Sequence, residues 1–234
     1  MKTIQQLFWI LISLLLFGCD TLSNAVSDNT NSTQSELPAP PVTTKTIQVA
    51  CVGDSITQGV GISNVSDRYP AQLSKLLGEG WKVKNFGVKS ATLMNAGNLP
   101  YGQTKKFHAS RGYNPDIVVI MLGTNDAKHH NWAKQHHFIS DYTKLIKSYE
   151  NLPSQPIVYI CYPPTVKKSV AGISNQRIKH EVIPKIKQVS LDNSVSVIDV
   201  HAAFYQKKGL FADDVHPNKH GAKEVANIVY STIY

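Results

Sequence analysis

Short apolar runs alternate with amphipathic stretches from about residue 45 to the end of the chain. Three of the runs are nearly continuous in β-branched and other apolar residues, which is typical of strands that are buried on both faces of a sheet. The runs predict five strands, at residues 47–52, 81–86, 117–122, 157–161 and 195–200.

The stretches between these runs predict helices at residues 69–77, 137–149, 173–189 and 222–232. In the third of them an isoleucine or valine recurs at helical spacing, at positions 178, 182, 186 and 189, and forms one apolar stripe. Strands and helices that alternate at these lengths favour an α/β fold, with a parallel sheet covered on both faces by right-handed crossovers. In such a fold the chemistry is expected at the carboxyl ends of the strands.

The first 44 residues follow a different pattern. Lys2 precedes an apolar run at residues 7–17, which has the length of a signal-peptide core and is short for a membrane span. The run ends in Leu-Phe-Gly-Cys and resembles a bacterial lipoprotein signal, residues 1–19, with Cys19 as the lipidated residue. A plain secretory signal or an uncleaved apolar anchor stays open. Residues 20–44, rich in Ser, Thr, Asn and Pro, predict a flexible tether before a single domain at residues 45–234.

The composition indicates a globular protein, with 42% hydrophobic and 17% charged residues. The net charge is +8, but the lysines are scattered and no arginine-rich run occurs. We therefore expect a solvated basic surface and no nucleic-acid partner, although an anionic polymer or a membrane surface would be a favourable neighbour. The lipoprotein signal predicts a secreted, membrane-anchored protein, periplasmic or at the cell surface, and we expect a monomer.

Two cysteines lie in predicted strands, Cys51 and Cys161. Buried free thiols are the default at such positions. A disulfide between them stays open, because sequence alone does not show whether the strands place the two residues within bonding distance.

Polar clusters follow the predicted strands, at residues 53–59, 85–93 and 123–126, and a fourth at residues 213–218 precedes the last helix. Together they contain what acyl transfer requires. Ser55 supplies a nucleophile, His216 a base, and Asp213 a carboxylate that can orient the histidine. The backbone N–H groups of Ser55 and Gly87 and the side-chain amide of Asn125 would form an oxyanion hole.

These clusters resemble the four blocks of the SGNH, or GDSL-type, hydrolase family, which centre on Ser, Gly, Asn and His. In this sequence the blocks fall on Ser55, Gly87, Asn125 and His216, and Asp213 matches the aspartate of the D-x-x-H block. The resemblance implies a flavodoxin-like three-layer α/β/α fold, a Ser-His-Asp triad that needs no metal and no cofactor, and hydrolysis of carboxylic esters. The sequence is most similar in kind to bacterial carbohydrate or sialate O-acetylesterases.

Other polar residues near the blocks have more than one interpretation. Asp214 could replace Asp213 as the partner of the histidine, but a spacing of three residues favours Asp213. Asp54 is expected to tie down the turn after the first strand rather than to act as a second triad acid. We keep Asp54 among the substrate-binding candidates, with Tyr101, His129 and Trp132. The histidines near residue 130 would also suit a metal, but no ligand-spaced carboxylate or cysteine accompanies them, and we expect no metal site.

The function expected from the sequence is therefore an extracytoplasmic O-acetylesterase that removes acetyl groups from carbohydrate. A lipase, lysophospholipase or thioesterase with a long acyl pocket is the main alternative, and an acetyltransferase with the same triad is another. An interpretation from a different class is a non-catalytic carbohydrate-binding lipoprotein, which would require the loss of at least one member of the catalytic set.

Overall fold

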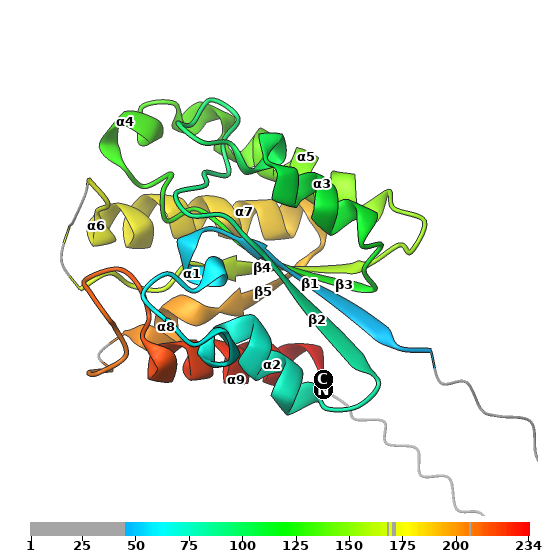
Figure 1. Ribbon diagram of the computed structural model, residues 1–234. Helices are drawn as coiled ribbons and strands as arrows, with labels where there is room; N and C mark the ends of the chain where they lie inside the picture. The colour runs from blue at the N-terminus through cyan, green and yellow to red at the C-terminus, as the bar shows by residue number, and fades with distance from the viewer. Residues whose placement is uncertain (1–44, 168, 170–171, 206) are drawn as a thin grey trace, which may run out of the picture. The chain divides into compact units, whose positions relative to one another are not determined.

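A sheet of five parallel strands forms the centre of the computed structural model (Figure 1). The structure describes residues 45–167, 169, 172–205 and 207–234, so the predicted signal, Cys19 and the tether lie outside the described residues. The strand order is β2-β1-β3-β4-β5, which is the flavodoxin-like order. The strands are β1 (Ile47–Gly53), β2 (Trp81–Gly87), β3 (Ile117–Met121), β4 (Ile157–Tyr162) and β5 (Ser196–Asp199).

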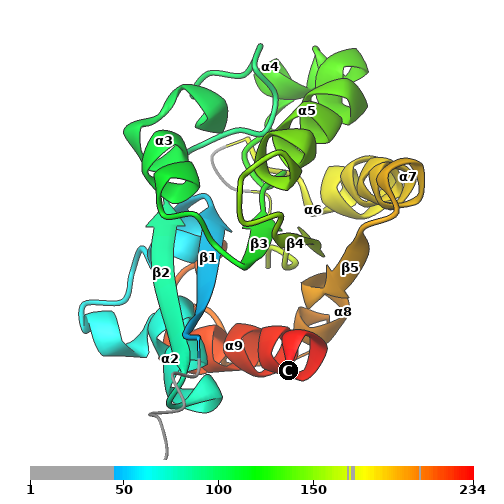
Figure 2. The ribbon, with the colours of Figure 1, turned by 90° about the vertical axis from the view of Figure 1, so that its right-hand side faces the viewer.

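Helices cover both faces of this sheet, which confirms the predicted three-layer α/β fold (Figure 2). The longer helices are α2 (Tyr69–Leu77), α3 (Lys105–Gly112), α5 (Phe138–Glu150), α7 (Ile183–Asn193) and α9 (Lys219–Ile233). The short ones are α1 (Ser55–Gln58), α4 (His129–Trp132), α6 (Asn175–Arg177) and α8 (Val200–Phe204). Within the described residues, no helix combines the length and the apolar character that crossing a membrane requires.

Alternation along the strands creates two separate cores. In β1, Val49 and Cys51 pack toward α2 and α9, whereas Ala50 and Val52 pack on the other face toward α5 and α7. All four side chains are fully buried. Burial on both faces explains why residues 49–52 of β1 and all of β3 are apolar. The edge strand β2 instead alternates, with exposed lysines at positions 82 and 84.

The helix predicted at residues 173–189 is built differently from the expectation. It begins at α6 and passes through a π-helical turn, Ile178–Val182, before α7. Pro184 lies in the first turn of α7 and has no N–H to donate to the preceding turn, which accounts for the wider turn at this point. The predicted apolar stripe is nevertheless intact, since all four of its members are fully buried.

Cys51 and Cys161 are buried free thiols. They lie on β1 and β4, and β3 runs between these two strands. Two strand spacings amount to roughly 9–10 Å, beyond the Cα separation that a disulfide allows. Burial raises the pKa of the Cys51 thiol to about 12, so this thiol stays protonated and unreactive at neutral pH.

The register of the sheet sets the position of the site. Gly53 at the end of β1 lies beside Gly87 of β2 on one side and Met121 of β3 on the other. The chain therefore leaves three adjacent strands at the same edge, and the segments that follow them are brought together there.

Candidate active site

Ser55 is the first residue of α1 and directly follows the turn at the end of β1. The buried Asp54 caps this helix, because its Oδ1 accepts the backbone N–H of Ile56 at 2.9 Å. A Cβ on Gly53 would lie 2.2 Å from Thr57 Oγ1 and 2.6 Å from the carbonyl oxygen of Met121. Only glycine fits at this position, so the sequence Gly-Asp-Ser produces a tight turn that presents the serine at the sheet edge.

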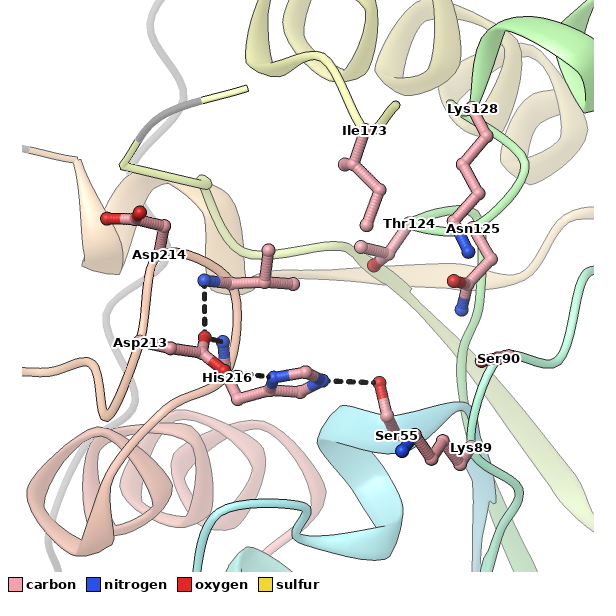
Figure 3. Close-up of a pocket in the computed structure, with 11 residues that line it drawn as sticks. Ser55, Lys89, Ser90, Thr124, Asn125, Lys128, Ile173, Asp213, Asp214 and His216 are labelled. Carbon is pink, nitrogen blue, oxygen red and sulfur yellow. Dashed lines mark hydrogen bonds and ion pairs between the residues drawn. The ribbon is translucent and has the colours of Figure 1, made fainter. Parts of the chain in front are cut away.

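Ser55, His216 and Asp213 form a connected row (Figure 3). The Oγ of Ser55 is 3.0 Å from Nε2 of His216, and Nδ1 of the same ring is 2.7 Å from Oδ2 of Asp213. The carboxylate accepts the proton of Nδ1, which leaves Nε2 as the acceptor for the serine hydroxyl. This is the geometry of a nucleophile, its base and the carboxylate that orients the base.

The Asp213 carboxylate is stabilised in its charged form. Partial burial raises its pKa, but hydrogen bonds from the backbone N–H and ring of His216 and from the N–H of Val215 outweigh burial, and the net pKa is lowered. Those backbone N–H groups donate to Oδ1 at 2.6 Å from His216 and 2.7 Å from Val215. A charged carboxylate beside the ring stabilises the imidazolium that forms when His216 takes up a proton.

The predicted role of Gly87 in the oxyanion hole is wrong. Its backbone N–H donates to Oδ1 of Asn85 at 2.9 Å, and Gly87 does not line the cavity at Ser55. A Cβ on Gly87 would lie 2.2 Å from the backbone nitrogen of Gln58. Gly87 is therefore needed because α1 packs directly against the end of β2.

Ser90 takes the place that was predicted for Gly87. It lines the cavity together with Ser55, and its φ of 65° is in the left-handed region that favours glycine. Its backbone N–H has no acceptor within the described residues, and the same holds for the N–H of Ser55 at the start of α1. Because both residues line the cavity, their N–H groups are the candidates for two oxyanion donors. Sequence reasoning missed Ser90 because it looked for a glycine.

Asn125 lies in the turn after β3, where it lines the same cavity and is 4% exposed. Its Nδ2 donates to the carbonyl oxygen of Ala91 at 3.1 Å and lies 3.5 Å from Oδ2 of Asp54. Burial raises the pKa of the Asp54 carboxyl to about 6. The contact with Ala91 ties the amide of Asn125, a predicted oxyanion donor, to the loop that carries Ser90.

Asp126 fastens the two loops to each other. Its carboxylate oxygens accept the backbone N–H groups of Leu93 and Met94, each at 2.9 Å. It is fully buried, and burial raises its pKa to about 6. Two hydrogen bonds to Asp126 therefore connect the segment after Ser90 to the loop that carries Asn125.

The cavity between these loops and His216 has a volume of about 320 Å³. Among the described residues that line it, two have apolar side chains, Ile173 and Val215. The remainder of the lining is polar or charged and includes Lys89 and Lys128. Lys128 and Ile173, which both line the cavity, pair with each other in an isolated antiparallel β-bridge.

The structure places none of the four substrate-binding candidates in this cavity. Tyr101 is fully buried and donates its hydroxyl to the carbonyl oxygen of Phe86 at 2.9 Å. Trp132 is 4% exposed and packs against Phe138. These two predictions are wrong, since both rings belong to the core under α5.

The other two candidates also lie outside the cavity lining. Asp54 is fully buried as the cap of α1, which agrees with the interpretation that it ties down the turn. His129 is an exposed residue of α4. In the part of the chain that the structure describes, no three His, Cys, Asp or Glu side chains gather where they could share a metal ion.

Known proteins resemble this chain in sequence. The family model for GDSL-like lipase/acylhydrolase proteins matches residues 51–224. An acetylxylan esterase from Xylanibacter ruminicola is 35% identical over 216 residues, which cover 84% of this chain and 45% of that protein. A multidomain esterase from Ruminococcus flavefaciens is 28% identical, over 83% of this chain and 30% of that protein. The chain thus spans less than half the length of these curated relatives.

Solved structures resemble it in fold. A carbohydrate acetylesterase from Sinorhizobium meliloti superposes with a TM-score of 0.67 at 19% identity, over 80% of this chain and 98% of that one. An acetyl xylan esterase gives a TM-score of 0.65 at 22% identity, over 80% of this chain and 100% of that one. At such identities the likeness shows the shared fold. With the family model matched over most of the described residues, the chain belongs to the GDSL-like lipase/acylhydrolase family.

Proposed function

We propose that the chain is a serine ester hydrolase in which Ser55 is the nucleophile. His216 takes the proton of the serine hydroxyl through Nε2 while Oγ attacks the ester carbonyl carbon. The oxygen that becomes negative accepts hydrogen bonds from the N–H groups of Ser55 and Ser90 and from the amide of Asn125. His216 then gives its proton to the departing alcohol oxygen. A water molecule, deprotonated by the same ring, attacks the acyl carbon. The bond from this carbon to Oγ of Ser55 then breaks, Oγ takes back the proton from Nε2, and the acid is released.

The residues that line the cavity favour a substrate with a short acyl group, and we propose acetyl. Two apolar side chains, Ile173 and Val215, offer little surface for burying a hydrocarbon chain, and each buried CH₂ contributes about 0.8 kcal/mol to binding. The polar lining suits a hydroxyl-rich alcohol, and the relatives described as acetylxylan or carbohydrate acetylesterases agree with this choice. The substrate we propose is therefore an O-acetylated carbohydrate.

The lipase, lysophospholipase or thioesterase alternative is less well supported. It needs an apolar groove for a long acyl chain, whereas nine of the eleven described residues that line the cavity at Ser55 are polar or charged. The carbohydrate-binding alternative needs the loss of a catalytic group, whereas Ser55, His216 and Asp213 are all present and in contact.

The location we propose rests on the sequence alone. The apolar segment that ends at Cys19 suits export and lipidation, and residues 20–44 suit a tether. A membrane-held, extracytoplasmic enzyme would meet polysaccharide outside the cell.

The test compares para-nitrophenyl acetate, butyrate and octanoate as substrates of the purified chain and of Ser55→Ala. We expect kcat/KM to fall sharply beyond acetate, and Ser55→Ala to lose at least about 10⁴-fold in kcat with an unchanged unfolding transition. Equal activity in Ser55→Ala would refute the mechanism. A preference for octanoate would refute the acetyl assignment in favour of a lipase.

A further inference from the structure

Two lysines border the cavity on the side of the oxyanion donors. Lys89 directly precedes Ser90, and Lys128 follows Asn125 by three residues. Within the described residues, no carboxylate lies within salt-bridge distance of either ammonium group. Both positive charges are therefore available to a ligand.

The backbone fixes where these two lysines start. The N–H of Lys128 donates to the carbonyl oxygen of Asn125 at 3.2 Å, and its β-bridge to Ile173 holds it from the other side. The N–H of Lys89 donates to Oε1 of Gln58 at 2.6 Å. Figure 3 shows the Lys128 side chain extending toward Asn125, on the cavity side of its loop. The two lysines thus belong to the same loops as the proposed oxyanion donors Ser90 and Asn125.

The two carboxylates that line the cavity lie on the side of His216, away from Lys128 (Figure 3). Asp213 already accepts three hydrogen bonds from His216 and Val215. The carboxylate of Asp214 points away from the histidine ring, on the side of the cavity far from Lys128 (Figure 3). The cavity is consequently basic next to Asn125 and Ser90 and acidic behind His216.

We propose that the acetylated carbohydrate carries a carboxylate, as a uronic acid does, and that Lys89 and Lys128 bind it. This inference rests on the proposed function, and an acetyl group has no charge, so the anion belongs to the sugar. A carboxylate in a partly enclosed cavity gains more from two nearby ammonium groups than it would in open water. The basic surface of the whole chain, with a net charge of +8, also favours an anionic polymer.

The experiment measures acetate release from two matched compounds. One is a methyl glucuronoside with a single O-acetyl group, and the other is the methyl glucoside acetylated at the same hydroxyl. At low salt we expect kcat/KM to be about tenfold higher for the uronate, which corresponds to about 1.4 kcal/mol. Raising the salt to about 0.5 M should reduce the ratio, because ions screen partly exposed charges.

Lys89→Met/Lys128→Met should lower the ratio of the two kcat/KM values to about one. Using the ratio cancels any general loss of activity in this variant. Lys82→Met/Lys84→Met is the matched control. It removes the same charge from two exposed residues of β2 that do not line the cavity, and should keep the tenfold ratio.

Four results would overturn the inference. Equal kcat/KM for the two sugars, or a preference that survives in Lys89→Met/Lys128→Met, would refute it while the esterase stands. A preference for para-nitrophenyl succinate over the acetate that disappears in the same variant would place the anion on the acyl group instead. Failure to release acetate from either sugar, with para-nitrophenyl acetate still hydrolysed, would refute the carbohydrate assignment and this inference together.

Discussion

Asp213 binds His216 through both of its carboxylate oxygens. Oδ2 lies 2.7 Å from the ring Nδ1, and Oδ1 accepts the backbone N–H of the same histidine at 2.6 Å. The second contact closes a turn of four residues, 213–216, so the ring and the backbone that carries it are oriented by one group. This explains how a histidine in an irregular segment keeps Nε2 directed at Ser55.

Asp213→Asn should reduce kcat by about 10⁴-fold with little change in fold, as for the matching change in chymotrypsin-type enzymes. The amide can still accept the backbone N–H, but an NH₂ group facing Nδ1 favours the wrong tautomer. Steady-state hydrolysis of para-nitrophenyl acetate measures the loss. Asp214→Asn is the control, because this carboxylate points away from the ring (Figure 3), and it should change kcat less than threefold. A greater loss of kcat in Asp214→Asn than in Asp213→Asn would show that Asp214, and not Asp213, is the carboxylate partner of His216.

Asn125→Ala should lower kcat by about 10²–10³-fold if its amide is an oxyanion donor. KM should change much less, since the donor acts on charge that develops only in the transition state. The separation of kcat from KM on para-nitrophenyl acetate checks this expectation. A fall of less than threefold in kcat would remove Asn125 from the oxyanion hole.

Ser90→Gly should retain kcat within about threefold, because glycine keeps the N–H and adopts a φ of 65° without strain. Ser90→Val should lower both kcat and the free energy of unfolding, the latter by about 1–3 kcal/mol, since a β-branched residue is strained at this φ. Kinetics and urea unfolding of the two variants measure these effects. Unchanged stability and full activity in Ser90→Val would contradict the strain expected for a β-branched residue at this φ.

Gly87→Ala should destabilise the protein by about 1–3 kcal/mol, because the new Cβ would lie 2.2 Å from the backbone of Gln58 and α1 would have to move. Activity should fall as well, since Ser55 is carried by α1. Gly112→Ala is the matched control. No atom lies within 4 Å of a Cβ at that position, and alanine should stabilise the end of α3 by up to about 1 kcal/mol. Equal stability of the two variants in urea would contradict the packing role of Gly87.

Asp126 should make stability depend on pH. Burial raises its pKa in the folded protein to about 6, above the value of about 3.9 in an unfolded chain. Between pH 4 and 6 the folded state therefore binds more protons at this group, and its contribution to the free energy of unfolding falls as pH rises.

Asp126→Asn removes this titration. The stability difference between wild type and variant should therefore be largest near pH 4 and smaller at pH 7, by up to about 3 kcal/mol. Urea unfolding at the two pH values measures it. A difference that does not change with pH would contradict the raised pKa of Asp126.

The central strands and the buried stripe at residues 178–189 could be predicted, because buried positions produce apolar patterns in the sequence. The sequence of helix α3 shows no such pattern. Its only buried residue is Ser110, so its sequence is polar nearly throughout. The π-helical turn had a visible signal in Pro184, but the apolar spacing alone predicted a continuous helix.

The site was predictable only in part. Residue type and spacing pointed to Ser55, Asp213 and His216, and the structure brings the three together. Ser90 was missed because a serine at positive φ has no signature in composition. Tyr101 was misplaced because sequence does not show which way a loop aromatic faces, and its hydroxyl finds a buried carbonyl partner on β2.

The contact between Ser55 and His216 joins residues that are 161 positions apart in the chain. The ribosome therefore completes the nucleophile and the loops with the hydrogen-bond donors long before it adds the base. A chain released anywhere before residue 216 would carry a serine with no group to accept its proton. Under the proposed function, ester hydrolysis would therefore report that translation has passed residue 216, and truncated products would be inactive in an activity screen.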